Sequence, residues 1–186
     1  MNNDLDLSFL SRVKPATAVT RVTDHPLFSR WQPKPGSGLY AAIETWLAAQ
    51  EEFNARQTAV TQANGRHAAL KKQLAIAQGG TIAQIERAAY EFNEAAAALG
   101  RLIALSDEAA GNLAAAAARL KNISDDLDQY QHNTNVYLGA ADRIIPDVAT
   151  GSTGDLQVLA ASMRDTLTRH GRKIQDTLGY PLVILH

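Results

Sequence analysis

The pattern of apolar and polar residues is dominated by a seven-residue repeat through the middle of the chain. In its first half, large residues stand seven apart, and mostly small apolar residues follow each of them by three positions. The large set is Leu39, Trp46, Phe53, Val60, His67 and Leu74, and the second set is Ala42, Ala49, Arg56, Ala63, Leu70 and Ala77. A mean spacing of 3.5 residues predicts a helix that packs through one coiled-coil-like stripe.

The same repeat returns in the second half of this stretch. Its leading set is Ile85, Phe92, Leu99, Ser106, Leu113, Leu120 and Leu127. The set interleaved with it is Ile82, Ala89, Ala96, Ile103, Ala110, Ala117 and Ser124. We therefore expect a second long helix, packed through these two sets and wound with the first into a left-handed supercoil.

Gly79 and Gly80 separate the two predicted helices. Glycine accepts the left-handed conformation in which helices often end, so the first helix is expected to stop here. Thr81 and Gln84 match the capping box that opens a helix. A short connection makes its helices antiparallel neighbours, so residues 39–131 are interpreted as one helical hairpin. Asn64-Gly65 favours a turn, yet the repeat keeps its phase across it, which predicts an unbroken helix weakened at Gly65.

Residues 1–38 are interpreted as a leader or anchoring segment. Residues 17–23 are rich in β-branched residues and predict a short strand. Phe28 and Trp31 belong to a small apolar cluster, and Ser37 is the expected N-cap of the first long helix.

Residues 132–186 form the third predicted segment. A short helix around Tyr137 is expected to end at Pro146, and a third helix is expected from Ser152 to Leu178, closed by Gly179. The tail that follows is short, apolar and prone to form a strand. It is expected to pair with residues 17–23, or to add as a strand to a partner.

Composition narrows the class of protein. The net charge of -1 gives no general signal for nucleic acid, and the absence of cysteine excludes disulfides and thiolate chemistry. The first residues lack the pattern of a signal peptide, and no stretch reaches the length of a membrane-spanning helix. The expected location is the cytoplasm. A protein packaged in a virion or exported by a dedicated secretion machinery would show the same lack of a signal peptide and of a membrane-spanning helix.

Candidate chemistry is sparse. His67 lies on the apolar stripe, where a metal or proton-switch role competes with the more common role of a tolerated polar residue. Arg56 is expected at the edge of the stripe with its stem buried. Asp125, Asp126 and Asp128 lack the glycine and distal glutamate of a calcium loop, so a solvated helix end is favoured. We expect no catalytic residue, metal or cofactor.

The turn between the two long helices is the more informative candidate. Residues 73–85 contain no charged side chain. A neutral tip indicates a contact surface, although small residues also simply suit a tight turn. The candidate partner-binding residues are Phe28, Trp31, Ile76, Gly79, Gly80, Ile82, Leu182, Val183, Ile184 and Leu185.

These expectations define an all-α fold: a long antiparallel helical hairpin, a third packed helix and a small β element from leader and tail. The expected function is that of a non-enzymatic structural or assembly protein with protein partners, forming a homo-oligomer or a larger assembly such as a virion or secretion apparatus. A secreted membrane-active helical protein is the first alternative. A helical accessory domain of an enzyme is the second.

Overall fold

The computed structural model describes residues 19–149 and 154–180, and every regular element within them is helical. In chain order these are η2 (Val22–Asp24), a 3-10 helix, and α1 (Pro26–Trp31), α2 (Gly38–Ala77), α3 (Ile82–Ala149) and α4 (Gly154–Leu178). The chain divides into two compact units, one of residues Glu44–Val136 and one of Met1–Ile43 with Tyr137–His186. The predicted all-α class is confirmed for the described residues.

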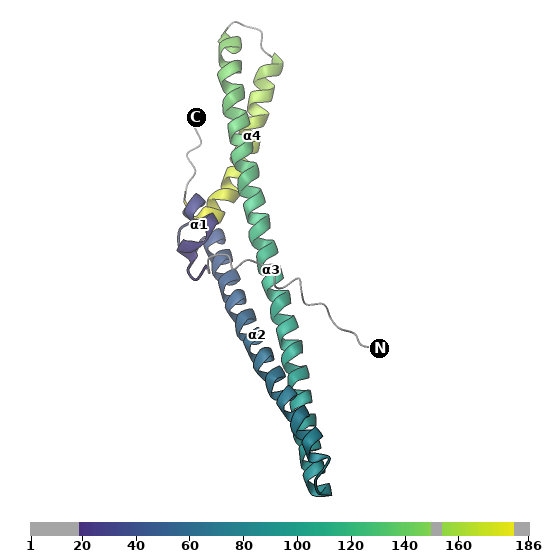
Figure 1. The fold of residues 1–186 in the computed structure, drawn as a ribbon. Helices are drawn as coiled ribbons and strands as arrows, with labels where there is room; N and C mark the ends of the chain where they lie inside the picture. Colours follow the sequence, from purple (N-terminus) through teal and green to yellow (C-terminus); the bar gives the residue numbers. More distant parts are fainter. Residues whose placement is uncertain (1–18, 150–153, 181–186) are drawn as a thin grey trace. The chain divides into compact units, whose positions relative to one another are not determined.

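The long helical hairpin is confirmed. Helices α2 and α3 lie side by side and run in opposite directions from the turn that joins them (Figure 1). Every predicted stripe position of α2 is buried or half-buried, and from Glu51 to Ala77 only Ala59 joins them. Gly65 lies inside α2, as predicted, so Asn64-Gly65 makes no turn.

On α3, the second set of the predicted stripe is confirmed only in part, because three of its seven positions are exposed. The leading set is buried or half-buried throughout, as predicted. The residues three positions after it, which the sequence pattern did not single out, are also all buried or half-buried: Ala88, Ala95, Leu102, Ala109, Ala116, Ile123 and Tyr130. Of the predicted companions, Ala117 is exposed, and Ile82 and Ile103 are 76% and 44% exposed. The other four are half-buried, as predicted: Ala89, Ala96, Ala110 and Ser124.

The reason is that both flanks of the leading set are apolar. Ala95 and Ala96, or Ala109 and Ala110, are neighbours of the same type on either side of one stripe. A seven-residue repeat places a helix face but does not tell which flank the partner helix covers when both flanks carry alanine. Packing against α2 decides the flank.

Helix α3 also continues past the predicted end of the hairpin. It runs without a break beyond Gln131 and through Pro146 to Ala149, so the separate short helix is wrong. Residues 132–135 are weak helix formers, but propensity is a small term that neighbouring structure overrides. The hydroxyl of Thr134 donates to the carbonyl of Tyr130 at 2.9 Å, inside this stretch. Pro146 lies in the last turn and has no amide to donate to the carbonyl one turn earlier, so the helix lacks one hydrogen bond there and ends three residues later.

The predicted strand at residues 17–23 is contradicted where the structure describes it. Residues 22–24 form a 3-10 turn in which Arg21 pairs with Asp24 at 3.2 Å, and no strand occurs within 19–149 or 154–180. β-branched residues favour a strand only when a neighbouring strand receives them. The tail partner predicted for it, residues 181–186, lies outside the described residues.

The third helix is confirmed from Gly154 to Leu178, although its predicted cap Ser152 lies outside the described residues. Its side chains Leu167, Ile174 and Leu178 are buried, as expected from its apolar face. Gly179, predicted to close this helix, follows with a φ of 78°, the left-handed conformation in which helices often end. At the start of α2, the Tyr40 amide donates to the Ser37 hydroxyl at 3.4 Å, which confirms the predicted cap.

We predict opposite effects for alanine at two hairpin glycines. A Cβ at Gly65 would meet no atom within 4 Å, so Gly65→Ala is expected to stabilise the protein by about 1 kcal/mol through helix propensity. A Cβ at Gly80 would approach the Ala77 carbonyl at 3.1 Å and collide with the Gln84 side chain, so Gly80→Ala is expected to destabilise by about 1 kcal/mol. Urea unfolding followed by circular dichroism measures both. Destabilisation by Gly65→Ala would show that α2 is interrupted there.

Candidate interaction surfaces

The tip of the hairpin is built by local hydrogen bonds. Helix α2 ends with two short-range bonds, from the amides of Gly79 and Gly80 to the carbonyls of Ile76 and Ala77, at 3.3 and 2.8 Å. Thr81 and Gln84 then form the predicted capping box. The Thr81 amide donates to Gln84 Oε1 at 2.8 Å, and the Gln84 amide donates to Thr81 Oγ1 at 3.4 Å.

The physical role of the tip glycines differs from the predicted one. Neither Gly79 nor Gly80 has a positive φ, so the turn does not depend on the left-handed conformation. Glycine is favoured at position 80 instead because Gln84 Oε1, the side-chain oxygen of the capping box, occupies the space of a Cβ. The capping box therefore favours glycine at position 80, and the missing side chain at this position leaves room for the Gln84 side chain.

Two isoleucines flank this turn and face solvent. Ile76 is 79% exposed at the end of α2, and Ile82 is 76% exposed at the start of α3. Beside them is a shallow groove of about 490 Å³, lined by Gln73, Ile76, Ala77, Gly79, Gly80, Gln84 and Ala88. Four of the predicted partner-binding residues thus gather at one place. Sequence reasoning missed Gln73, Gln84 and Ala88, which the turn brings together.

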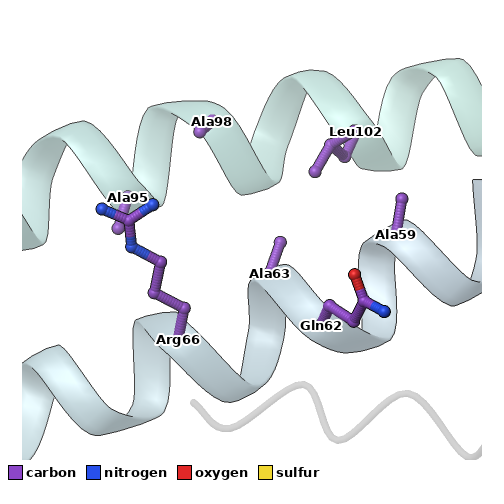
Figure 2. A pocket seen from close by; sticks show the side chains of 7 residues that line it. All are labelled: Ala59, Gln62, Ala63, Arg66, Ala95, Ala98 and Leu102. Carbon is purple, nitrogen blue, oxygen red and sulfur yellow. The ribbon is translucent and has the colours of Figure 1, made fainter.

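A second groove lies between α2 and α3 farther from the tip. It measures about 350 Å³ and is lined by Ala59, Gln62, Ala63, Arg66, Ala95, Ala98 and Leu102. Figure 2 shows Ala59 and Ala63 pointing from α2 toward α3, and Arg66 reaching across to Ala95. Small side chains on both helices leave this hollow, and the long Arg66 side chain partly covers it.

Phe28 and Trp31, the other described candidates, pack within their own unit. Both side chains are half-buried, and the Phe28 ring meets the Tyr40 ring edge-on at a centroid distance of 6.4 Å. The Tyr180 hydroxyl donates to the Trp31 carbonyl at 2.6 Å, and burial raises the pKa of that phenol. Residues 182–185, the remaining candidates, lie outside the described part of the chain.

The backbone next to Trp31 also holds the end of α4. The Lys34 amide donates to the Leu178 carbonyl at 2.9 Å. A groove of about 390 Å³ borders this contact, lined by Lys34, Pro35, Gly36, Ser37, Gln175, Asp176 and Gly179. The short segment 31–34 is thus joined by hydrogen bonds at both of its ends to residues distant in sequence, Tyr180 and Leu178.

The polar residues singled out in the sequence serve helix packing. The His67 ring stacks on Phe92 of α3 at a centroid distance of 4.7 Å. Arg56 pairs with Glu52 at 3.2 Å, and Asp125 pairs with Lys121 at 2.6 Å, each one helical turn away. Ser106, buried on the stripe, accepts a hydrogen bond from the Gln57 amide at 3.0 Å. Within residues 19–149 and 154–180, no group of three metal-ligating side chains comes together.

The same residues contain no helix that is long and apolar enough to cross a membrane. Comparisons of the chain with protein families, curated proteins and solved structures find no match. The candidate surfaces therefore have to be interpreted from their own chemistry.

We predict that alanine at Gly179 destabilises the protein more than alanine at Gly36. Both glycines have a φ near 80°, so both variants lose about 1 kcal/mol from the left-handed backbone. A Cβ at Gly36 meets open space, whereas one at Gly179 would approach the Cβ atoms of Ser37 and Lys34 at 3.0 and 3.1 Å. Thermal unfolding compares the two. Equal losses would show that the contact between residues 34–37 and the end of α4 is loose.

We also predict that acid weakens α1 through His25. Its Nδ1 accepts a hydrogen bond from the Leu27 amide at 3.1 Å, and burial lowers the pKa of this imidazole below the ordinary value. The unfolded chain therefore binds the proton more readily than the folded one. The stabilisation of the folded protein by neutral His25 is complete above about pH 6.5. It is lost as the pH falls through the ordinary pKa of histidine toward the lowered pKa of His25.

His25→Asn is the control for this prediction, because asparagine caps a helix without titrating. The difference in melting temperature between the variant and the wild type should change between pH 7.5 and 5. A constant difference across this range would contradict the assignment.

Proposed function

We propose that this protein is a non-enzymatic structural or assembly component that acts by packing its exposed helix surfaces against other protein chains. The observation that supports this most directly is the tip of the hairpin. Ile76 and Ile82 expose most of their surface on either side of a short turn that carries no charge.

The energetics favour a contact at this tip. Burying an isoleucine side chain contributes about 1.5–3 kcal/mol, so two of them on one rigid turn supply a useful share of a binding energy. The turn is held by its own capping box, so little conformational freedom is lost when it docks. The groove beside Ile76, with the amides of Gln73 and Gln84 at its edge, offers a partner both apolar area and hydrogen bonds.

The polar residues of the hairpin support the non-enzymatic part of the proposal. His67, from the large set of α2, stacks on Phe92 inside the helix pair. Ser106, from the leading set of α3, accepts a hydrogen bond from Gln57. Both side chains act as packing groups there.

The uncharged tip also favours one alternative, a membrane-active protein whose tip enters a lipid interface. An interfacial segment gains from apolar side chains in the same way as a protein contact does. The two functions place different demands on the tip. Binding to a lipid surface needs only apolar area, whereas binding to a protein partner also needs a groove whose shape fits that partner.

We predict that Ile76→Ser with Ile82→Ser lowers the mass of the assembled protein without changing its helix content. The measurement is light scattering over a concentration series, with the monomer mass of 20.0 kDa as reference. Val158→Ser is the matched control, because Val158 is 70% exposed on α4 and away from the tip turn in sequence. It should leave the mass unchanged.

A liposome-leakage assay completes the test. The proposal expects no leakage from neutral or anionic vesicles. Leakage that disappears in the double variant, with a monomeric mass throughout, would replace the proposal by the membrane-active alternative.

A further inference from the structure

Helix α3 has a second face, opposite the stripe that packs on α2. The residues along this face follow one another in alternating steps of three and four positions, and all of them are exposed. They are Tyr90, Asn93, Ala97, Gly100, Ala104, Asp107, Gly111, Ala114 and Ala118. The adjoining column contains Ile103, which is 44% exposed, and Tyr90 is 67% exposed. Within its own unit, α3 is thus covered on one side and open on the other.

Glycine on this face has no intramolecular explanation. A Cβ at Gly100 or at Gly111 would meet no atom within 4 Å. Each glycine costs the helix about 1 kcal/mol relative to alanine, and no contact within the described residues uses the space it leaves.

A column of alternating charges borders the face. Arg87, Glu94, Arg101 and Glu108 stand seven residues apart, so they lie in a line along the helix. When two copies of this column lie side by side in opposite directions, each positive charge meets a negative one. A parallel copy in the same register would bring like charges together.

We propose that a second copy of this chain binds this face of α3 in the antiparallel direction, with the two-fold axis between residues 97 and 98. In this register, Glu94 meets Arg101 of the second copy and Arg87 meets Glu108 of the second copy, and symmetry repeats both pairs. Arg87 also pairs with Glu91 on its own helix at 3.0 Å, and its five donors allow both contacts. Glu94, Arg101 and Glu108 form no ion pair within the part of the chain that the structure describes.

The apolar residues agree with the register that the charges select. Tyr90 comes to lie opposite Ala104 of the second copy, at nearly the same height. Ile103 falls between Ala89 and Ala96 of the second copy. Ala97 meets its own equivalent at the axis, with Gly100 beside it. Large side chains thus meet small ones, which is the condition for close helix packing.

The size of the contact sets its strength. Helices that overlap from residue 82 to residue 113 share a length of about 48 Å. A strip of that length and a helix width buries on the order of 1,000 Å² in total, the low end for a specific interface. The dimer is therefore expected at micromolar concentrations rather than nanomolar ones, and added salt should weaken it.

The inference deepens the proposed assembly function, on which it rests, by naming the occupant of α3. Its test is charge reversal followed by sedimentation velocity. Glu94→Arg and Arg101→Glu each place two like-charge pairs at the axis, so each alone should weaken the dimer about tenfold. Mixing the two variants in equal amounts restores every pair and should restore the dimer, as should the double variant. Lys72→Glu, an exposed reversal on α2, is the matched control and should change nothing.

Two further variants separate assembly from folding. Gly100→Gln fills open space and improves helix propensity, so it should raise the melting temperature while it weakens the dimer. Because the chain has no cysteine, Ala97→Cys should form a disulfide-linked dimer under mild oxidation. Ala118→Cys, in the same column but far from the axis, should not.

Three results would overturn the inference: a monomer at every concentration, a mixture of Glu94→Arg and Arg101→Glu that stays monomeric, or equal cross-linking at both cysteines. The Ile76→Ser/Ile82→Ser protein keeps the α3 face intact. If it still dimerises while the tip contact is lost, or the reverse, the two proposals are distinguished.

Discussion

The fold of this protein depends on the antiparallel pairing of α2 and α3 through one narrow stripe on each helix. The turn determines which residues meet, because every contact of the pair lies at a similar distance from it on both arms. The hydrogen bond from Gln57 to Ser106 and the stacking of His67 on Phe92 occupy matching positions of this kind. These two polar contacts fit the register that the turn imposes and add to the alanine contacts that stabilise it.

A pair of helices has little interior. Outside the stripe, the side chains of Glu44–Val136 face solvent or lie at the edge of the helix contact, and the grooves between the arms are shallow. A catalytic centre needs several groups that converge in a water-poor pocket, whereas a binding surface needs only area, shape and charge. The exposed area of this helix pair includes the tip and the uncovered side of α3, which are the two surfaces on which contacts are proposed.

Sequence alone predicts the parts of this fold that are encoded locally. The hairpin, the capping box at Thr81, the cap at Ser37 and the left-handed Gly179 all follow from residues within a few positions of each other. The failures have a different origin. The strand at residues 17–23 needed a partner strand, and the end of α3 was placed at weak helix formers that neighbouring structure overrides. The role of Gly80 was missed because it depends on where the Gln84 side chain lies.

The second set of the α3 stripe, which is confirmed only in part, is the most informative of these cases. A repeat is ambiguous only when more than one flank of a helix is apolar. Alanine, the best helix former, can also occupy such a flank without packing against a partner. On α3 the ambiguity comes from Ala89, Ala96 and Ile103 on one side and Ala88, Ala95 and Leu102 on the other. Ala89 and Ala96 are half-buried like the second group, whereas Ile103 remains exposed beside an open face bordered by self-complementary charges. The second apolar flank, which makes the sequence pattern ambiguous, thus adjoins the face on which we propose that a second copy packs.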